Sequence, residues 1–234
     1  MACPAGFQQE RCQNRLWPLI GVTLLAVLLL TGRAVCAEPG PLVVLQEMSD
    51  HVLEIIRQDP AILDDPIRLR KLADAFVVPN IDFMVLSQWV LGKHWRGANP
   101  GQRQVFADEF RELLIRTYLA SVTRSGYQDQ TISYLPLRNA HDGRKVTVEA
   151  HVEPPQGPLV HVLFRMLKRE EGWKVYDVVI EGVSLVATHR SGFSSIIREQ
   201  GIDGLIATLE QRNKDVAGEA VGGRQSPGDR HPER

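Results

Sequence analysis

Apolar residues recur at helical spacing from residue 41 to about residue 125, and they alternate with polar ones from residue 131 onward. The helical part predicts a series of amphipathic helices with proline or glycine at their ends. The last of them should run past five turns, long enough to span a domain. The expected helices lie at Pro41–Gln58, from Asp65-Pro66 onward, at Phe83–Leu91, and from Asn99-Pro100 onward.

The alternating part predicts four strands joined by short connections. Turn residues such as Asp142-Gly143 and Glu171-Gly172 separate them, and short turns between successive strands favour an antiparallel meander. The last strand carries apolar residues on both faces, so it should lie inside a layered domain. The expected strands are Thr131–Leu135, Lys145–Val152, Val160–Lys168 and Trp173–Ile180.

A further helical pattern follows the last strand. Ser184 is a suitable N-cap, Gly201 should end the first helix, and a second helix should follow it. These helices must close over the strand that precedes them. The pattern therefore predicts an α+β fold, in which a twisted four-stranded antiparallel meander packs with several helices. It suits the cone-shaped, nuclear-transport-factor-like class, which hosts both enzymes and binding modules.

The N-terminal region has the layout of a secretory signal peptide. Arg11 and Arg15 precede the apolar run Leu16–Leu30, and Val35-Cys36-Ala37 fits a cleavage site. The run has 15 residues, whereas the alternative, a membrane-spanning anchor, needs about 20. We therefore expect a signal peptide at 1–37 and a periplasmic mature protein. The domain should cover 38–213, and the polar, Gly-rich segment 214–234 is predicted to be a disordered tail.

The positions of the cysteines and the net charge of the chain exclude several classes of function. All three cysteines (Cys3, Cys12 and Cys36) precede the expected cleavage site, so the mature chain should have no disulfide, thiolate metal site or cysteine nucleophile. The whole chain carries a formal charge of −1. Without Arg11, Arg15, Arg33 and Glu10 it keeps 24 basic and 27 acidic residues. This balance argues against a nucleic-acid partner.

No motif of a known catalytic site is present: the sequence has no G-x-S-x-G, H-E-x-x-H, P-loop or G-x-G-x-x-G. Asp177 interrupts an apolar strand, but a buried aspartate more often bonds backbone or an arginine such as Arg190. His151 and His161 could approach each other across a hairpin, yet a metal would need a third ligand and none stands out. We expect a protein that is not an enzyme and that has no cofactor or metal.

Two long motifs carry a family resemblance. The pattern L-G-x-x-W-R-x-A-x-P-x-Q-x-x-x-F-x-x-x-F-x-x-L-x-x-x-Y spans Leu91 to Tyr118, and W-K-V-Y-D-V-x-x-E-G-V-S-L-V spans Trp173 to Val186. Together they resemble the MlaC family, also called the toluene-tolerance family, over roughly Leu42 to Arg212. One departure is Thr188-His189-Arg190, where the family often has an aromatic residue.

The resemblance implies a periplasmic phospholipid carrier of Gram-negative bacteria. Such proteins shuttle lipid between an outer-membrane lipoprotein complex and an inner-membrane ABC transporter, which maintains the asymmetry of the outer membrane. A related branch is associated with hopanoid-type lipids. Two alternatives remain open: an exported enzyme of the same fold class with a polar pocket at Asp177, and a lipid-independent adaptor with a filled core.

A carrier needs a hydrophobic cavity between the sheet and the helices. We expect apolar side chains of the long helix, the sheet and the closing helices to line it. The predicted lipid-binding residues are Phe110, Leu114, Tyr118, Val148, Val162, Phe164, Val178, Ile180, Phe193 and Ile197.

Overall fold

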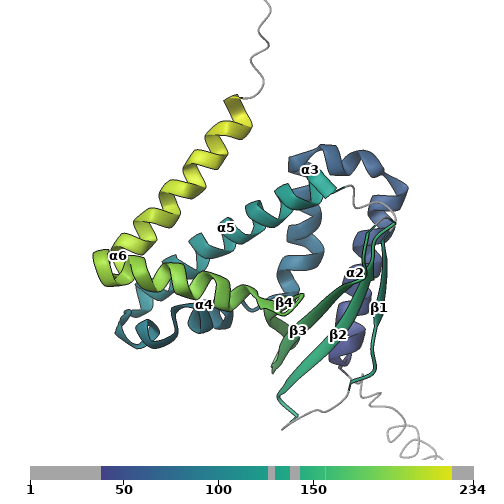
Figure 1. Cartoon of the computed structure of the whole chain (residues 1–234), viewed down its shortest axis with the longest axis horizontal. Coiled ribbons are helices and arrows are strands. Elements are labelled where there is room, and N and C mark those ends of the chain that lie inside the picture. The colour runs from purple at the N-terminus through teal and green to yellow at the C-terminus, as the bar shows by residue number, and fades with distance from the viewer. Residues whose placement is uncertain (1–37, 126–129, 138–142, 156, 223–234) are drawn as a thin grey trace, which may run out of the picture. The chain divides into compact units, whose positions relative to one another are not determined.

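The computed structural model describes residues 38–125, 130–137, 143–155 and 157–222 (Figure 1). The predicted signal peptide at 1–37 and residues 223–234 of the predicted tail lie outside them. The chain divides into two compact units, Met1–Glu38 and Pro39–Arg234, and the features below belong to the second. Within the described ranges, no helix combines the length and the apolar character needed to cross a membrane.

The helices before the sheet begin where the sequence predicts. Asp65 caps its helix by accepting hydrogen bonds from the backbone N–H of Ile67 and of Arg68, at 2.9 and 3.1 Å. Asn99 and Gln102 bond each other's backbone N–H, which is a capping box. The elements are α2 (Pro41–Gln58), η1 (Pro60–Asp64), α3 (Pro66–Leu72), the π-helical turn η2 (Ala73–Val77), η3 (Val78–Asn80), α4 (Phe83–Leu91), η4 (Gly92–Gly97) and α5 (Pro100–Ser125).

The sheet is an antiparallel meander, as predicted, but it has five strands rather than four in the described ranges. The additional strand, β5, pairs Val183 with Ile180 and Ser184 with Val179. It was missed because two residues are too few to show an alternating pattern. The strands, in both chain and spatial order, are β1 (Thr131–Tyr134), β2 (Lys145–Glu153), β3 (Val160–Arg169), β4 (Gly172–Ile180) and β5 (Val183–Ser184).

A β-bulge interrupts the pairing of β3 with β4. Arg165 pairs with Asp177 and Met166 with Val175, so Tyr176 is the extra residue. The extra residue reverses, on one side of the bulge, which residues of β4 point to each face of the sheet. As a result Val175 and Val178 pack on the same face of the sheet, and Tyr176 stacks on Trp89 instead, with ring centroids 5.9 Å apart.

The last helix, α6 (Leu185–Gly222), is broken where the sequence predicts. Gly201 has φ +73° and ψ −177°, a conformation that leaves the helix and that glycine adopts without strain. The predicted disordered tail is wrong in its first part, since the helix continues from Lys214 to Gly222. Contacts one turn apart support this extension: Lys214 pairs with Glu210, and Gln211 bonds Asp215.

Among the described residues, three apolar clusters hold the unit together. In the first, α4, α5 and α6 pack around Phe106 and Phe110. In the second, Leu45 of α2 packs on one face of β2, β3 and β4, and Figure 1 shows α2 lying along the sheet. In the third, the end of α2 meets η1 and α3 around Ile56. The sheet and the long helices therefore each have their own core.

Candidate functional site

The five predicted lipid-binding residues of the sheet share one face. Val148, Phe164 and Val178 are direct neighbours across β2, β3 and β4, and Val162 and Ile180 are neighbours on an adjacent row. Because side chains of paired residues point to the same side, this register places all five together. That they bind lipid stays a prediction.

Accessibility differs among the residues of this face. Val148 has no accessible surface, because Leu45 of α2 packs with it in the sheet cluster. Phe164 and Val178 are partly buried. Ile180, at the far end, is 41% exposed although it is a large apolar residue. The face is thus closed under α2 and open toward Ile180.

Four of the five predicted helical residues lie in the other large cluster. Phe110 and Leu114 of α5 pack with Phe193 and Ile197 of α6, and the Phe110 and Phe193 ring centroids are 5.4 Å apart. The His189 ring lies 5.0 Å from that of Phe110. Burial lowers the pKa of His189, and the charge of Arg212 lowers it further. Phe110 has no accessible surface, so this group is closely packed.

Tyr118, the fifth helical residue, is different because it is 42% exposed. Partial burial raises the pKa of its hydroxyl, and the nearby carboxylate of Asp177 adds to the effect. Seven of the ten predicted residues therefore fall into two packed groups, three in the sheet cluster and four among the helices. Tyr118 and Ile180 are the two that lie open to the surface.

Asp177, the residue considered for catalysis, is engaged in structural bonds. It is 1% exposed and accepts hydrogen bonds from Arg165 Nη1 at 2.8 Å, Ser184 Oγ at 2.8 Å and the backbone N–H of Val186 at 3.1 Å. The bonds from Ser184 Oγ and from the N–H of Val186 give two donors at the start of α6 an acceptor. Asp177 thus joins β3, β4 and the first turn of α6, and Arg165 is its basic partner rather than Arg190.

A cationic cleft is another feature that the sequence did not predict. It has a volume of about 570 Å³, lies between α4 and the β2–β3 side of the sheet, and includes Trp89 and Trp95 in its wall. Among the residues that the structure describes, no acidic side chain lines it. Its cations come from four separate parts of the chain, so no run of charge marks it in the sequence. They are Arg96, Arg144, Lys145, Lys168, Arg169 and Arg190.

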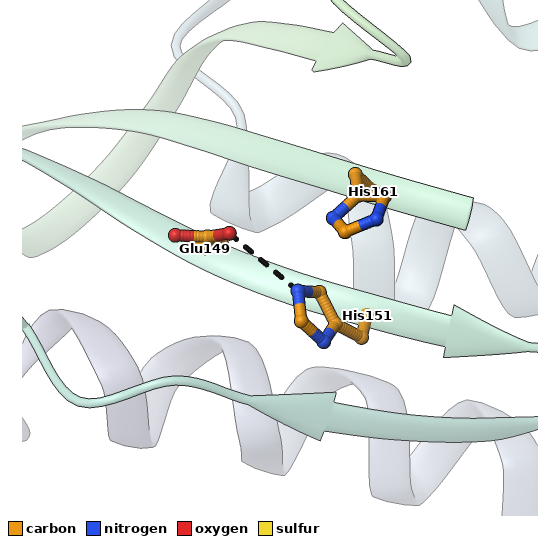
Figure 2. Close-up of side chains that lie close together, drawn as sticks. All are labelled: Glu149, His151 and His161. Atoms are coloured by element: carbon orange, nitrogen blue, oxygen red, sulfur yellow. Dashed lines mark ion pairs between the residues drawn. The ribbon is translucent and has the colours of Figure 1, made fainter. Parts of the chain in front are cut away.

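One group of side chains has the composition of a metal site. His151 of β2 and His161 of β3 are paired, as their spacing predicts, and Glu149 precedes His151 by two residues on the same face. Figure 2 shows the two rings and the carboxylate close together. Glu149 is a potential third ligand that was not recognised from the sequence, where its only signal is the i, i+2 spacing.

The fold and its apolar sheet face define the chain as a relative of lipid-binding α+β proteins of known structure. It resembles the phospholipid-binding protein from Ralstonia solanacearum, solved in complex with a phospholipid, with 33% identity and a TM-score of 0.69. The match covers 76% of this chain and 99% of that one. The family described as MlaC protein matches residues 46–211, well over half of the chain. The chain belongs to the MlaC family.

Two relatives are also similar over much of their length. The intermembrane phospholipid transport system binding protein MlaC of Haemophilus influenzae is 27% identical over 203 residues, which cover 85% of this chain and 94% of that protein. The toluene tolerance protein ttg2D of Pseudomonas putida is 27% identical over 142 residues, 61% of this chain and 62% of that protein. The family expected from the two sequence motifs is confirmed.

Proposed function

We propose that this protein binds phospholipid through its acyl chains and carries it between membranes. The observation that supports the proposal most is the likeness to a structure containing phospholipid, which extends over 99% of that chain. The apolar face formed by Val162, Phe164, Val178 and Ile180 is the surface we assign to the acyl chains.

The energetics of transfer suit a binding protein that performs no chemistry. Two acyl chains hold about 30 methylenes, and burying each is worth about 0.8 kcal/mol, or about 25 kcal/mol relative to water. That exceeds the ceiling of about 18–21 kcal/mol for non-covalent binding. The competing site is a bilayer, however, in which the chains are equally dry. Transfer between bilayer and protein can therefore be close to balanced.

In the described conformation, the residues at the centre of the proposed binding site are closed to solvent. Phe110 and Val148 have no accessible surface, so acyl chains could reach Phe110 only if α5 and α6 separated, and Val148 only if α2 moved off the sheet. We propose that the chains first contact Ile180 and Tyr118, each more than 40% exposed, and then separate the packed groups. Leu114, Phe193 and Ile197 would line the opened cavity on the helical side.

We further propose that segment 1–37 directs export to the periplasm. The partners would be an inner-membrane ABC transporter complex and an outer-membrane lipoprotein complex, and no catalytic step is involved. The name of the Haemophilus influenzae relative supports a transport system as the setting. A hopanoid-type lipid remains an alternative cargo.

Extraction of the purified protein with organic solvent, followed by mass spectrometry, tests the proposal. The protein should be prepared without detergent, and about one phospholipid per chain is expected. An extract free of lipid would contradict the carrier function. Finding a hopanoid in place of phospholipid would support the carrier function but would change the identity of the lipid carried.

A matched pair of variants tests the assigned face. Val162 is 7% exposed, so Val162→Asp risks unfolding, whereas Ile180 is exposed enough to accept a charge. Ile180→Asp should fold, as judged by circular dichroism, and should lose most of its bound lipid. Ile67→Asp is the control, because Ile67 is 65% exposed and lies on α3. Equal lipid content in the two variants would remove Ile180 from the site.

A further inference from the structure

The outer side of the β2–β3 hairpin holds two histidines and a glutamate in one group. His151 and His161 are directly paired across the two strands, and their ring centroids are 4.6 Å apart at an interplanar angle of 76°. Glu149 lies two residues before His151, so its side chain points to the same face. These three belong to the face opposite Val162 and Ile180, since odd and even positions of the strands alternate.

The distances suit a small cation. One potential ligand atom from each residue lies within 4.8 Å of the other two. Ligands of a tetrahedral Zn²⁺ at about 2.1 Å lie about 3.4 Å from one another. The difference is small enough for side-chain rotation to close, because the Glu149 and His151 side chains are only partly buried and His161 is exposed.

The nitrogen that would bind the ion lacks a hydrogen-bond partner. Nε2 of His151 is buried, and nothing in the described ranges of the chain bonds it. The nearest carboxylate oxygen, Oε1 of Glu149, is 3.5 Å away, which is beyond a good hydrogen bond (Figure 2). A buried polar atom without a partner is costly, and a ligated cation would satisfy it.

Hydrogen bonds hold the backbone beside the group, and two further carboxylate side chains, of Glu181 and Glu153, lie close to it at the strand ends. The backbone N–H of His161 donates to Oε1 of Glu181, and the backbone N–H of Glu181 donates to the carbonyl of His161. Glu153 lies two residues after His151 on the same strand face. Two more carboxylates near the group favour a cation over an anion.

We propose that Glu149, His151 and His161 form a binding site for a divalent transition ion of the Zn²⁺ type. Two imidazoles and one carboxylate are a ligand set that Zn²⁺ accepts, and hard ions such as Mg²⁺ prefer oxygen ligands alone. Three protein ligands leave a fourth position for water or for a ligand from another molecule. The ion would link β2 to β3 on the face of the sheet opposite the side chains of Val162 and Ile180.

Isothermal titration of the untagged, full-length protein with ZnCl₂ tests the site. Cysteines are alkylated beforehand, because Cys3, Cys12 and Cys36 could bind zinc themselves. We expect one Zn²⁺ per chain, a higher midpoint of thermal unfolding with Zn²⁺ than with Mg²⁺, and a Co²⁺ complex with the visible absorption of a tetrahedral site.

Three single variants decide the assignment. His161→Asn and Glu149→Gln should weaken Zn²⁺ binding by more than roughly tenfold, since even groups outside the ligand shell contribute that much in other sites. His51→Asn, on α2, is the control and should bind as the parent does. Absence of binding by the parent would overturn the proposal. So would binding that all three variants retain, which would mark an adventitious ion only.

Discussion

At the scale of single residues, Asp177 shows how one buried charge organises the start of α6. Three donors from β3, β5 and α6 converge on its carboxylate. Its strongest charged partner, Arg165, is 44% exposed and therefore partly screened by solvent. The backbone and hydroxyl bonds consequently contribute much of the stabilisation, and they explain why an aspartate interrupts an apolar strand.

Replacing Asp177 should destabilise the fold. Asp177→Ala leaves the N–H of Val186 and the hydroxyl of Ser184 without their acceptor, and we expect a loss of about 2–4 kcal/mol in the free energy of unfolding. Asp177→Asn keeps an acceptor oxygen and should lose less. Urea denaturation measures both. Equal stability of Asp177→Ala and the parent would show that these bonds contribute nothing.

Glu112 supplies a pH-dependent interaction between α3 and α5. Its carboxylate accepts two hydrogen bonds from Arg70, at 2.8 and 2.9 Å, and this contact lowers the pKa of Glu112. A carboxyl whose pKa is lower in the folded state stabilises the fold at neutral pH. That contribution is lost as the pH falls through the unfolded-state pKa toward the folded-state pKa.

Glu112→Gln should therefore cost about 1 kcal/mol at pH 7, and the difference from the parent should shrink below about pH 5. Urea unfolding at several pH values measures it. Glu54→Gln is the matched control: Glu54 pairs with Arg57 at 3.8 Å, and both side chains are more than half exposed. The control should change stability by less than about 0.5 kcal/mol. A pH-independent difference for Glu112→Gln would exclude the ionic contribution.

At the scale of elements, Gly192 and Gly201 of α6 have opposite roles. Gly192 is helical and Gly201 is not, while a β-carbon at either position would meet no atom within 4 Å. Space is therefore equal at the two sites, and only the backbone conformation differs. This makes them a natural pair for measuring what the break in the helix costs.

Gly192→Ala should raise the free energy of unfolding by about 0.5–1 kcal/mol, because alanine favours the helix. Gly201→Ala should lower it by about 1–3 kcal/mol, because a β-carbon is strained at φ +73°. Thermal and urea unfolding measure both changes. Stabilisation by Gly201→Ala would indicate that α6 can run straight through residue 201.

The elements show what could be predicted from local pattern and what could not. Caps such as Asp65 and Asn99 act within four residues, so the starts of α3 and α5 were predictable. The bulge at Tyr176 was not, because it depends on how β4 pairs with β3. Neither was the helical part of the tail, whose side-chain pairs at Glu210–Lys214 and Gln211–Asp215 are individually weak.

At the scale of the whole molecule, the candidate site was predictable in part. The alternation of apolar and polar residues along β2 and β3 is enough to predict an apolar face that contains Val148, Val162 and Phe164. The same pattern does not distinguish core from cavity, because a filled core and an acyl-chain pocket need the same residue types. Only accessibility separates Val148, which is fully enclosed, from Ile180, which is open.

The cationic cleft is likewise a property of the assembled fold. The chain as a whole is nearly neutral, yet the strand ends at Arg144-Lys145 and Lys168-Arg169 meet Arg96 and Arg190 beside Trp89 and Trp95. Arg169 is paired with Asp82, and Lys145 lies over the Trp89 ring at 5.5 Å. A concentration of positive charge in a concave surface attracts anionic surfaces and accelerates encounter with them. A bilayer that contains anionic phospholipid is such a surface.

If the cleft guides the carrier to anionic bilayers, replacing two of its cations should slow lipid delivery without emptying the protein. Arg144→Ser with Lys145→Ser should lower the rate of fluorescent-lipid transfer to anionic vesicles roughly three- to tenfold at low salt. The difference should shrink as ionic strength rises, because salt screens the attraction. Arg198→Ser, on α6, removes a cation that bonds Ser195 outside the cleft and should leave the rate unchanged. An equal rate for the double variant and the parent at low salt would exclude this surface as the membrane-facing one, whereas loss of the bound lipid would place the two cations in the binding site instead.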